Sequence, residues 1–130
     1  MRWTEGIEYK SVDDGYNLIV ESFENCGIKG VTYSKPSGYI ELYSDGGLIL
    51  SEKYWWNGSN CSIDTDTNIG PSAFHDAGYW LLDNDIIPNT WGNRKKIDKM
   101  FYKLCRKAGM RWCRARYFYR GVRTFGWLAC

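Results

Sequence analysis

The hydrophobic pattern of this chain changes its period near residue 70, and this change limits the possible folds more than any other feature. Before it, turn residues separate short β-favouring runs at residues 16–20, 38–43 and 47–50. After it, apolar residues recur three and four positions apart, which is the spacing of an amphipathic helix. The sequence therefore predicts an α+β fold, with a β-rich N-terminal part of short antiparallel strands followed by three helices.

Turn and capping residues predict where these elements begin and end. The segment Ser44-Asp-Gly-Gly47 separates two of the runs and is a strong hairpin signal. The first helix is expected over residues 71–83 with Ser72 as its N-cap. The second and third helices are expected over residues 94–108, where Gly109 would supply the C-cap, and 111–125.

A chain of 130 residues is long enough for one domain and too short for two of ordinary size. We therefore expect a single domain over residues 1–130. Within it, residues 1–56 form the β-rich part and residues 71–126 form the helical core. Residues 57–70 are rich in side-chain oxygens and turn formers, and predict a loop suited to binding a metal ion.

Charge is distributed unevenly along the chain. Residues 1–90 carry 5 basic and 14 acidic side chains, a net charge of −9, whereas residues 91–130 carry 12 basic and one acidic, a net charge of +11. An evenly mixed surface would not divide in this way. The last third of the chain therefore favours an anionic partner, or an acidic surface of this or another protein.

The cysteine spacing and the length of the apolar stretches argue against a zinc protein, a membrane-spanning protein and a protein with a secretory signal. The five cysteines form no CxxC pair and no zinc-ligand cluster, so we expect free thiols, with Cys105 and Cys113 able to pair only in an oxidising compartment. The uncharged stretches are too short for a transmembrane helix, and the first residues lack the apolar core of a secretory signal. We expect neither a transmembrane segment nor a signal peptide.

The sole histidine, His75, is the first candidate for chemistry. On antiparallel helices, Asp98 would reach its imidazole, and a carboxylate that orients a histidine is the usual arrangement of a general base. Asp76 lies about 100° around the helix from His75 and would face the oxygen-rich loop, an environment that suits calcium. No nucleophile elbow or phosphate-binding glycine loop is present, so the pattern favours activation of water beside a metal. The same spacing also fits an inert buried hydrogen-bond network.

Two segments carry a family resemblance. Phe74-His75-Asp76-Ala77-Gly78-Tyr79, followed by Arg94-Lys95-Lys96-Ile97-Asp98-Lys99-Met100-Phe101-Tyr102, resembles the helix pair of secreted phospholipase A2, above all its small prokaryotic and fungal branch. The segments at residues 115–119 and 122–126 are similar to the last helix of that branch. The match covers roughly residues 55–126.

A second resemblance covers more of the chain. A family of small proteins from tailed-phage genomes has a β-rich N-terminal part, a Trp-Asp-Gly-x-Ser loop and an Ile-Asp-Thr segment before a His-Asp-x-x-Tyr helix. Here residues 51–59, Ile63-Asp64-Thr65 and the helices follow that order. The two families look like branches of one architecture, and this chain is similar to the phage branch.

The resemblance implies a role for each site residue. His75 would be the base that activates water, Asp98 its orienting partner, and Tyr79 a donor to Asp98. Asp76 would be the calcium carboxylate, and the Asn57-Gly58 loop would supply further calcium oxygens. The family's loop acid is Asn57 in this chain, and the loss of one formal charge is expected to weaken the calcium site.

Two functions follow from these expectations. One is a phage-encoded phospholipase A2-like esterase that uses calcium and acts on phospholipid at a membrane surface. The alternative is a catalytically inactive phage protein that uses this fold for virion assembly or for binding a host factor, including interference with host defence. Either protein would act in the host cytoplasm or the virion. Nucleic-acid binding is the third function in order of preference, because a lysine-rich helix face is more often simply solvated.

Overall fold

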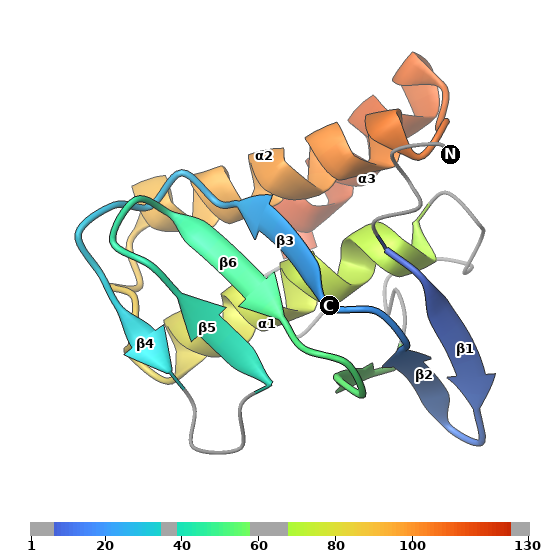
Figure 1. The fold of residues 1–130 in the computed structure, drawn as a ribbon. Helices are drawn as coiled ribbons and strands as arrows, with labels where there is room; N and C mark the ends of the chain where they lie inside the picture. Colours follow the sequence, from blue (N-terminus) through green and yellow to red (C-terminus); the bar gives the residue numbers. More distant parts are fainter. Residues whose placement is uncertain (1–6, 35–38, 58–67, 126–130) are drawn as a thin grey trace.

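The computed structural model describes residues 7–34, 39–57 and 68–125, and it has the predicted α+β class. Two antiparallel sheets precede three helices in chain order (Figure 1). The strands are β1 (Tyr9–Val12), β2 (Gly15–Leu18), β3 (Ser22–Asn25), β4 (Tyr33–Ser34), β5 (Ile40–Leu42), β6 (Gly47–Leu50) and β7 (Trp55–Trp56). The helices are α1 (Ile69–Asp83), α2 (Trp91–Lys107) and α3 (Trp112–Phe125).

The strands form two small sheets, in the orders β1-β2-β7 and β3-β6-β5-β4. The hairpin predicted at residues 44–47 is confirmed, since it joins β5 to β6 with Ile40 opposite Leu50 and Leu42 opposite Leu48. Gly46 adopts a positive φ of 93°, and the Asp45 Oδ1 atom accepts a hydrogen bond of 2.9 Å from the Gly47 amide. A glycine at position 46 suits this turn because a side chain there would be strained.

Four strands were not predicted: β1, β3, β4 and β7. The first three contain mostly exposed or half-buried residues, as the sequences YKSV and SFEN of β1 and β3 illustrate, and β7 has only two residues. All four lie at the edge of a sheet, where only one neighbouring strand is available. Edge position removes the alternation of apolar and polar residues that marks a half-buried strand in sequence.

The first two helices begin earlier than the capping residues predicted. Ser72 is not the N-cap of α1, because Asn68 occupies that position and Ser72 lies within the first turn. There its hydroxyl donates to the Ile69 carbonyl at 2.6 Å and accepts the Trp56 indole N–H at 2.9 Å. Helix α2 starts at Trp91 rather than residue 94, since the Thr90 Oγ1 atom accepts the Asn93 amide as an N-cap.

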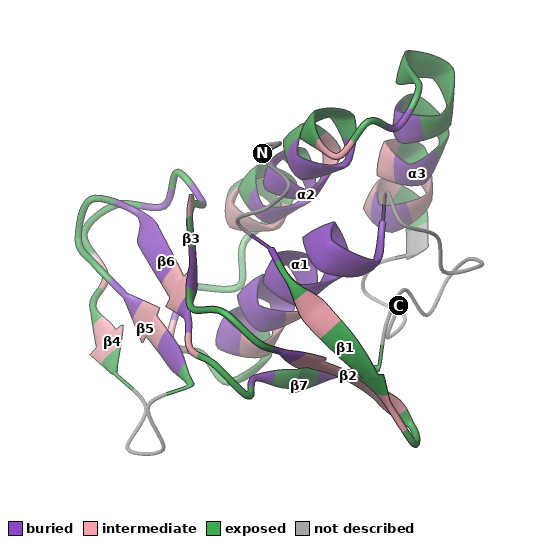
Figure 2. Cartoon of the chain, turned by 45° about the vertical axis from the view of Figure 1, so that its right-hand side comes forward, coloured by how far each residue is buried: buried purple, intermediate pink, exposed green. Residues whose placement is uncertain are grey.

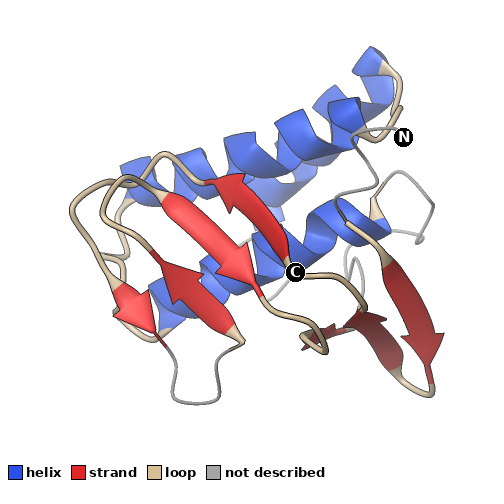
Figure 3. Cartoon of the chain, viewed as in Figure 1, coloured by secondary structure: helices blue, strands red, loops and turns tan. Residues whose placement is uncertain are grey.

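Helix α1 is buried on two sides, as its two apolar stripes predict (Figure 2). The strands cover one side and α2 packs against another, with α3 packed on α2 (Figure 3). The main core joins both sheets to α1 and the inner face of α2; its fully buried members include Leu18, Leu48, Trp56, Phe74 and Leu104. A second cluster lies between α2 and α3 and consists of Phe101, Cys105, Met110, Ala115, Phe118 and Val122.

Gly78 allows α1 and α2 to approach closely. A Cβ atom added there would lie 2.7 Å from both Cδ1 and Cγ2 of Ile97, which is fully buried. We expect Gly78→Ala to lower the free energy of unfolding by about 1–2 kcal/mol, because overpacking outweighs the gain of roughly 1 kcal/mol in helix propensity. Urea denaturation measures this change.

The matched control is Gly121→Ala in α3, where an added Cβ atom meets nothing within 4 Å. This variant is expected to gain stability from helix propensity alone. The cost of Gly78→Ala should also disappear in an Ile97→Ala background, which removes the clashing atoms. An equal cost in both backgrounds would show that the close contact is not the cause.

Within the described ranges, no helix is long and apolar enough to cross a bilayer. Three cysteines fall in those ranges, and all are free: Cys26 and Cys105 are buried and Cys113 is exposed. The optional Cys105–Cys113 disulfide is therefore not formed. Burial raises the pKa of the Cys105 thiol, which makes it a poor nucleophile.

Candidate active site

The packing of α1 on α2 brings three of the predicted residues together. His75 and Tyr79 lie one turn apart on α1, and both reach the Asp98 carboxylate on α2. His75 Nε2 lies 2.8 Å from Asp98 Oδ1, and the Tyr79 hydroxyl donates to the same oxygen at 2.9 Å. The hydrogen bonds expected from the sequence are present, while the catalytic roles of these residues stay predictions.

A fourth member of the cluster, Arg123 on α3, was not predicted. Its Nη1 atom donates to Asp98 Oδ2 at 2.7 Å, and the Asp98 side chain is fully buried. The Arg123 guanidinium also stacks over the Trp91 ring, with Cζ 4.0 Å from the ring centroid. A buried carboxylate needs a cationic partner, but α3 carries several arginines and nothing in the sequence separates Arg123 from the others.

The hydrogen bond to Asp98 fixes the orientation of the His75 ring. A proton on Nε2 donates to the carboxylate, so the lone pair of a neutral imidazole lies on Nδ1. The rings of Tyr79 and Phe101 hold the imidazole in place, with centroids 4.6 Å and 4.9 Å from its own. Nδ1 has no hydrogen-bond partner among the described residues, and His75 is 6% exposed. The arrangement can accept a proton at Nδ1.

Tyr79 acts in this cluster as a donor only. Burial and the neighbouring Asp98 carboxylate both disfavour a tyrosinate and raise the pKa of Tyr79 well above its ordinary value, although the nearby Arg94 opposes this. The hydroxyl therefore keeps its proton at neutral pH. Tyr79 orients Asp98 and is not a candidate general base.

Asp76 faces another side of α1 from His75, as its position on the helix predicts. Its Oδ2 atom accepts a hydrogen bond of 3.3 Å from the Tyr54 hydroxyl, just before β7. Burial raises the pKa of the Asp76 carboxyl, and the Tyr54 bond and the charge of His75 only partly offset this effect. Asp76 is thus a half-buried carboxylate whose ionised form would be stabilised by a further positive charge nearby.

The remaining residues predicted to bind a metal lie at or beyond the end of β7. Tyr54 and Trp56 both face α1, where they bond Asp76 and Ser72, whereas Asn57, just after β7, is exposed. Gly58 and residues 58–67 of the predicted loop fall outside the described residues. Among the described residues, no three His, Cys, Asp or Glu side chains form a group that could hold a metal ion.

These observations test how far the described residues fit calcium. Asp76 Oδ1 has no hydrogen-bond partner among them, so this oxygen is available as a ligand. Calcium takes roughly six to eight oxygen ligands, so Asp76 alone is not a complete site. Among the predicted ligands that the structure describes, only Asp76 offers a carboxylate oxygen for calcium.

The raised pKa of Asp76 leads to a prediction on stability. The folded state binds more protons at Asp76 than the unfolded state between the ordinary and the raised pKa, so the free energy of unfolding falls as pH rises through that window. Asp76→Asn should therefore be more stable than the unmodified chain near neutral pH without calcium. The gain should vanish below the ordinary carboxyl pKa.

If Asp76 is a ligand, calcium should make the unmodified chain more stable than Asp76→Asn, the reverse of their order without calcium. Thermal denaturation of both, with calcium or with chelator, measures this, because a bound ion stabilises only the form that binds it. Asp85→Asn, which changes an exposed acid just after the same helix, is the control. An equal effect of calcium on Asp76→Asn and the unmodified chain would remove Asp76 from the metal site.

No protein-family model, no curated protein and no solved structure matches the chain.

Proposed function

We propose that this chain is a phospholipase A2-like esterase of the tailed-phage type, which hydrolyses phospholipid esters with a water activated by His75. The observation that supports the proposal is the cluster of His75, Asp98 and Tyr79, with the imidazole held through Nε2 and Nδ1 left without a partner. A general base needs this combination of a fixed ring and an available lone pair. The motif resemblance supplies the substrate class.

In the proposed reaction, His75 Nδ1 takes a proton from water as the water attacks the ester carbonyl. The resulting imidazolium donates from Nε2 to Asp98, whose carboxylate stabilises the charge. Nδ1 then returns its proton to the leaving alcohol. Calcium, when bound with Asp76 among its ligands, supplies Lewis-acid polarisation of the carbonyl and charge to hold the phosphate.

Arg123 adds a feature to this scheme. Its guanidinium already neutralises Asp98 in the resting site. Asp98 therefore stabilises the imidazolium less than an unshared carboxylate would, because two positive charges would then share one negative charge. We expect the Arg123–Asp98 contact to lower the rate of hydrolysis somewhat, and the main role of Asp98 to be the orientation of the imidazole ring.

The test is fatty-acid release from phosphatidylglycerol and phosphatidylcholine vesicles, measured with calcium and with chelator. Chelator-sensitive release of fatty acid supports the proposal. No release from folded protein at any calcium concentration contradicts it. Localisation in the host cytoplasm or the virion, as proposed for a phage protein, would be followed by tagging the chain during infection.

A second candidate function is supported by Arg123 as well. With Arg123 and Tyr79 as donors, the buried Asp98 is satisfied without any catalytic role, as in a structural network. The chain would then be an inactive phage protein that binds a virion or host protein. Absence of hydrolysis together with unchanged stability in calcium favours this function over the first.

A further inference from the structure

A groove between α2 and α3 lies outside the His75 cluster. It has a volume of about 430 Å³ and is lined by Lys99, Tyr102, Lys103, Arg116, Tyr119 and Arg120. This volume falls within the range of about 300–1,000 Å³ that is typical of small-molecule sites. None of the six residues belongs to the His75 cluster, so the groove is independent of the proposed hydrolysis.

The two walls of the groove repeat one pattern. Lys99, Tyr102 and Lys103 on α2 have the same spacing as Arg116, Tyr119 and Arg120 on α3, namely i, i+3 and i+4. Residues at this spacing share one face of a helix. Each wall therefore carries two cations and one tyrosine toward the same space.

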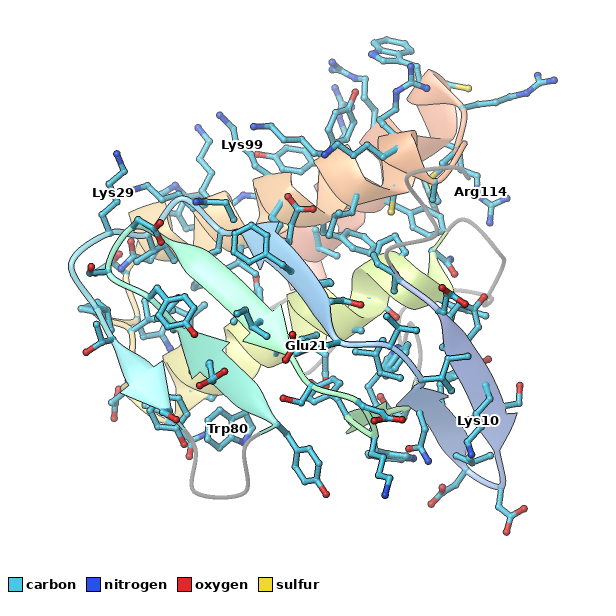
Figure 4. The ribbon with its side chains drawn as sticks, in the orientation of Figure 1. Lys10, Glu21, Lys29, Trp80, Lys99 and Arg114 are labelled. Atoms are coloured by element: carbon cyan, nitrogen blue, oxygen red, sulfur yellow. The ribbon has the colours of Figure 1, made fainter. Side chains whose placement is uncertain are left out.

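The tyrosines meet between the cations. The rings of Tyr102 and Tyr119 pack edge to face, with centroids 5.9 Å apart and an interplanar angle of 73°. Both rings are half-buried, whereas the four cations are exposed. Lys99 points away from the strands into solvent (Figure 4). The groove thus has an aromatic lining with positive charge around it.

The positive charge of the groove is not neutralised locally. Asp98 is the one acidic residue in residues 91–130, and it is buried against His75 and Arg123. Among the described residues, none of the four groove cations forms an ion pair, and the Arg116 guanidinium is stacked on the Trp112 ring at 5.0 Å. Like charges that line one groove repel one another, and an anion bound between them would relieve this repulsion.

We propose that this groove binds a soluble ligand that carries two or more linked phosphate groups. Lysine and arginine are the side chains that bind phosphate, and two cations on each wall match more charge than a single phosphate offers. The tyrosine rings provide an apolar surface for the rest of the ligand. A concave site of this size suits a small molecule better than a flat bilayer or a long duplex.

The test uses calorimetric titration with inorganic triphosphate at low salt. The full chain should bind triphosphate at least tenfold more tightly than inorganic phosphate. Lys103→Gln/Arg120→Gln, which removes one cation from each wall, should raise the Kd for triphosphate at least tenfold. Both positions are exposed, so folding is expected to be unaffected and is checked by circular dichroism.

The matched control is Lys95→Gln/Arg111→Gln, which removes the same charge from exposed positions outside the groove. Its Kd should change less than twofold. Equal weakening by both double variants would mean general attraction to a basic protein and would overturn the proposal. Absence of triphosphate binding, or binding only to phosphatidylglycerol vesicles or to duplex DNA, would overturn it as well.

Discussion

Replacing His75 with glutamine is expected to lower the turnover of phospholipid by at least about 10³-fold, because general-base catalysis contributes about 10²–10⁴ and no second histidine is present. Glutamine can donate an amide N–H to Asp98 in place of Nε2, so the buried hydrogen bond and the fold are preserved. It has no lone pair of comparable basicity at the Nδ1 position. Fatty-acid release from vesicles measures the effect.

A control variant separates loss of chemistry from loss of stability. Ile40→Val, on β5 in the main core, reduces packing but is remote in the fold from His75, Asp98 and Tyr79. It should cost about 1 kcal/mol of stability and change turnover less than threefold. Turnover in His75→Gln that matches this control would exclude His75 as the base.

The second large effect is expected at Asp98. Asp98→Ala should lower the free energy of unfolding by about 3–5 kcal/mol, because it leaves the guanidinium of Arg123 without its counter-charge and two further donors without an acceptor. Denaturation in urea, followed by tryptophan fluorescence, measures this loss. Asp83→Ala, at an exposed position of α1, should change stability by less than about 0.5 kcal/mol.

A double-mutant cycle identifies the source of that loss. Arg123→Ala alone leaves a buried carboxylate with neutral donors and should also destabilise the chain. The double variant Asp98→Ala/Arg123→Ala should lose less stability than the sum of the two single variants, with a coupling of about 0.5–3 kcal/mol. Additive losses would show that the 2.7 Å contact does not stabilise the fold.

The contact between His75 and Asp98 was predictable because both residues lie on strongly periodic helices. Their positions relative to the apolar stripes determine which side of each helix is buried, and two packed helices then leave few ways to satisfy a buried carboxylate. The hydrogen bond from Tyr79 to Asp98 was expected only from the family resemblance. The class of the fold was predictable for a similar reason, since the period changes once along the chain.

Other features depend on tertiary contacts that local sequence does not encode. Arg123 reaches Asp98 because α3 packs at a particular angle on α2, and the arginines of α3 look alike in sequence. The edge strands β1 and β4 exist through pairing with a neighbour and carry no apolar alternation. The start of α1 at Ile69 depends on the Trp56 indole, which bonds both the Ile69 carbonyl and Ser72 and so organises the first turn from outside the helix.

The position of Arg123 has a consequence for how the helices behave as a unit. Helix α3 rests on α2 through a cluster of its own, and its guanidinium shares Asp98 with the imidazole of α1. Because one carboxylate holds both groups, a change that displaces α3 also alters the contact that orients the imidazole, and a change at His75 alters the attachment of α3. The attachment of the third helix and the orientation of the candidate base are therefore energetically coupled through Asp98.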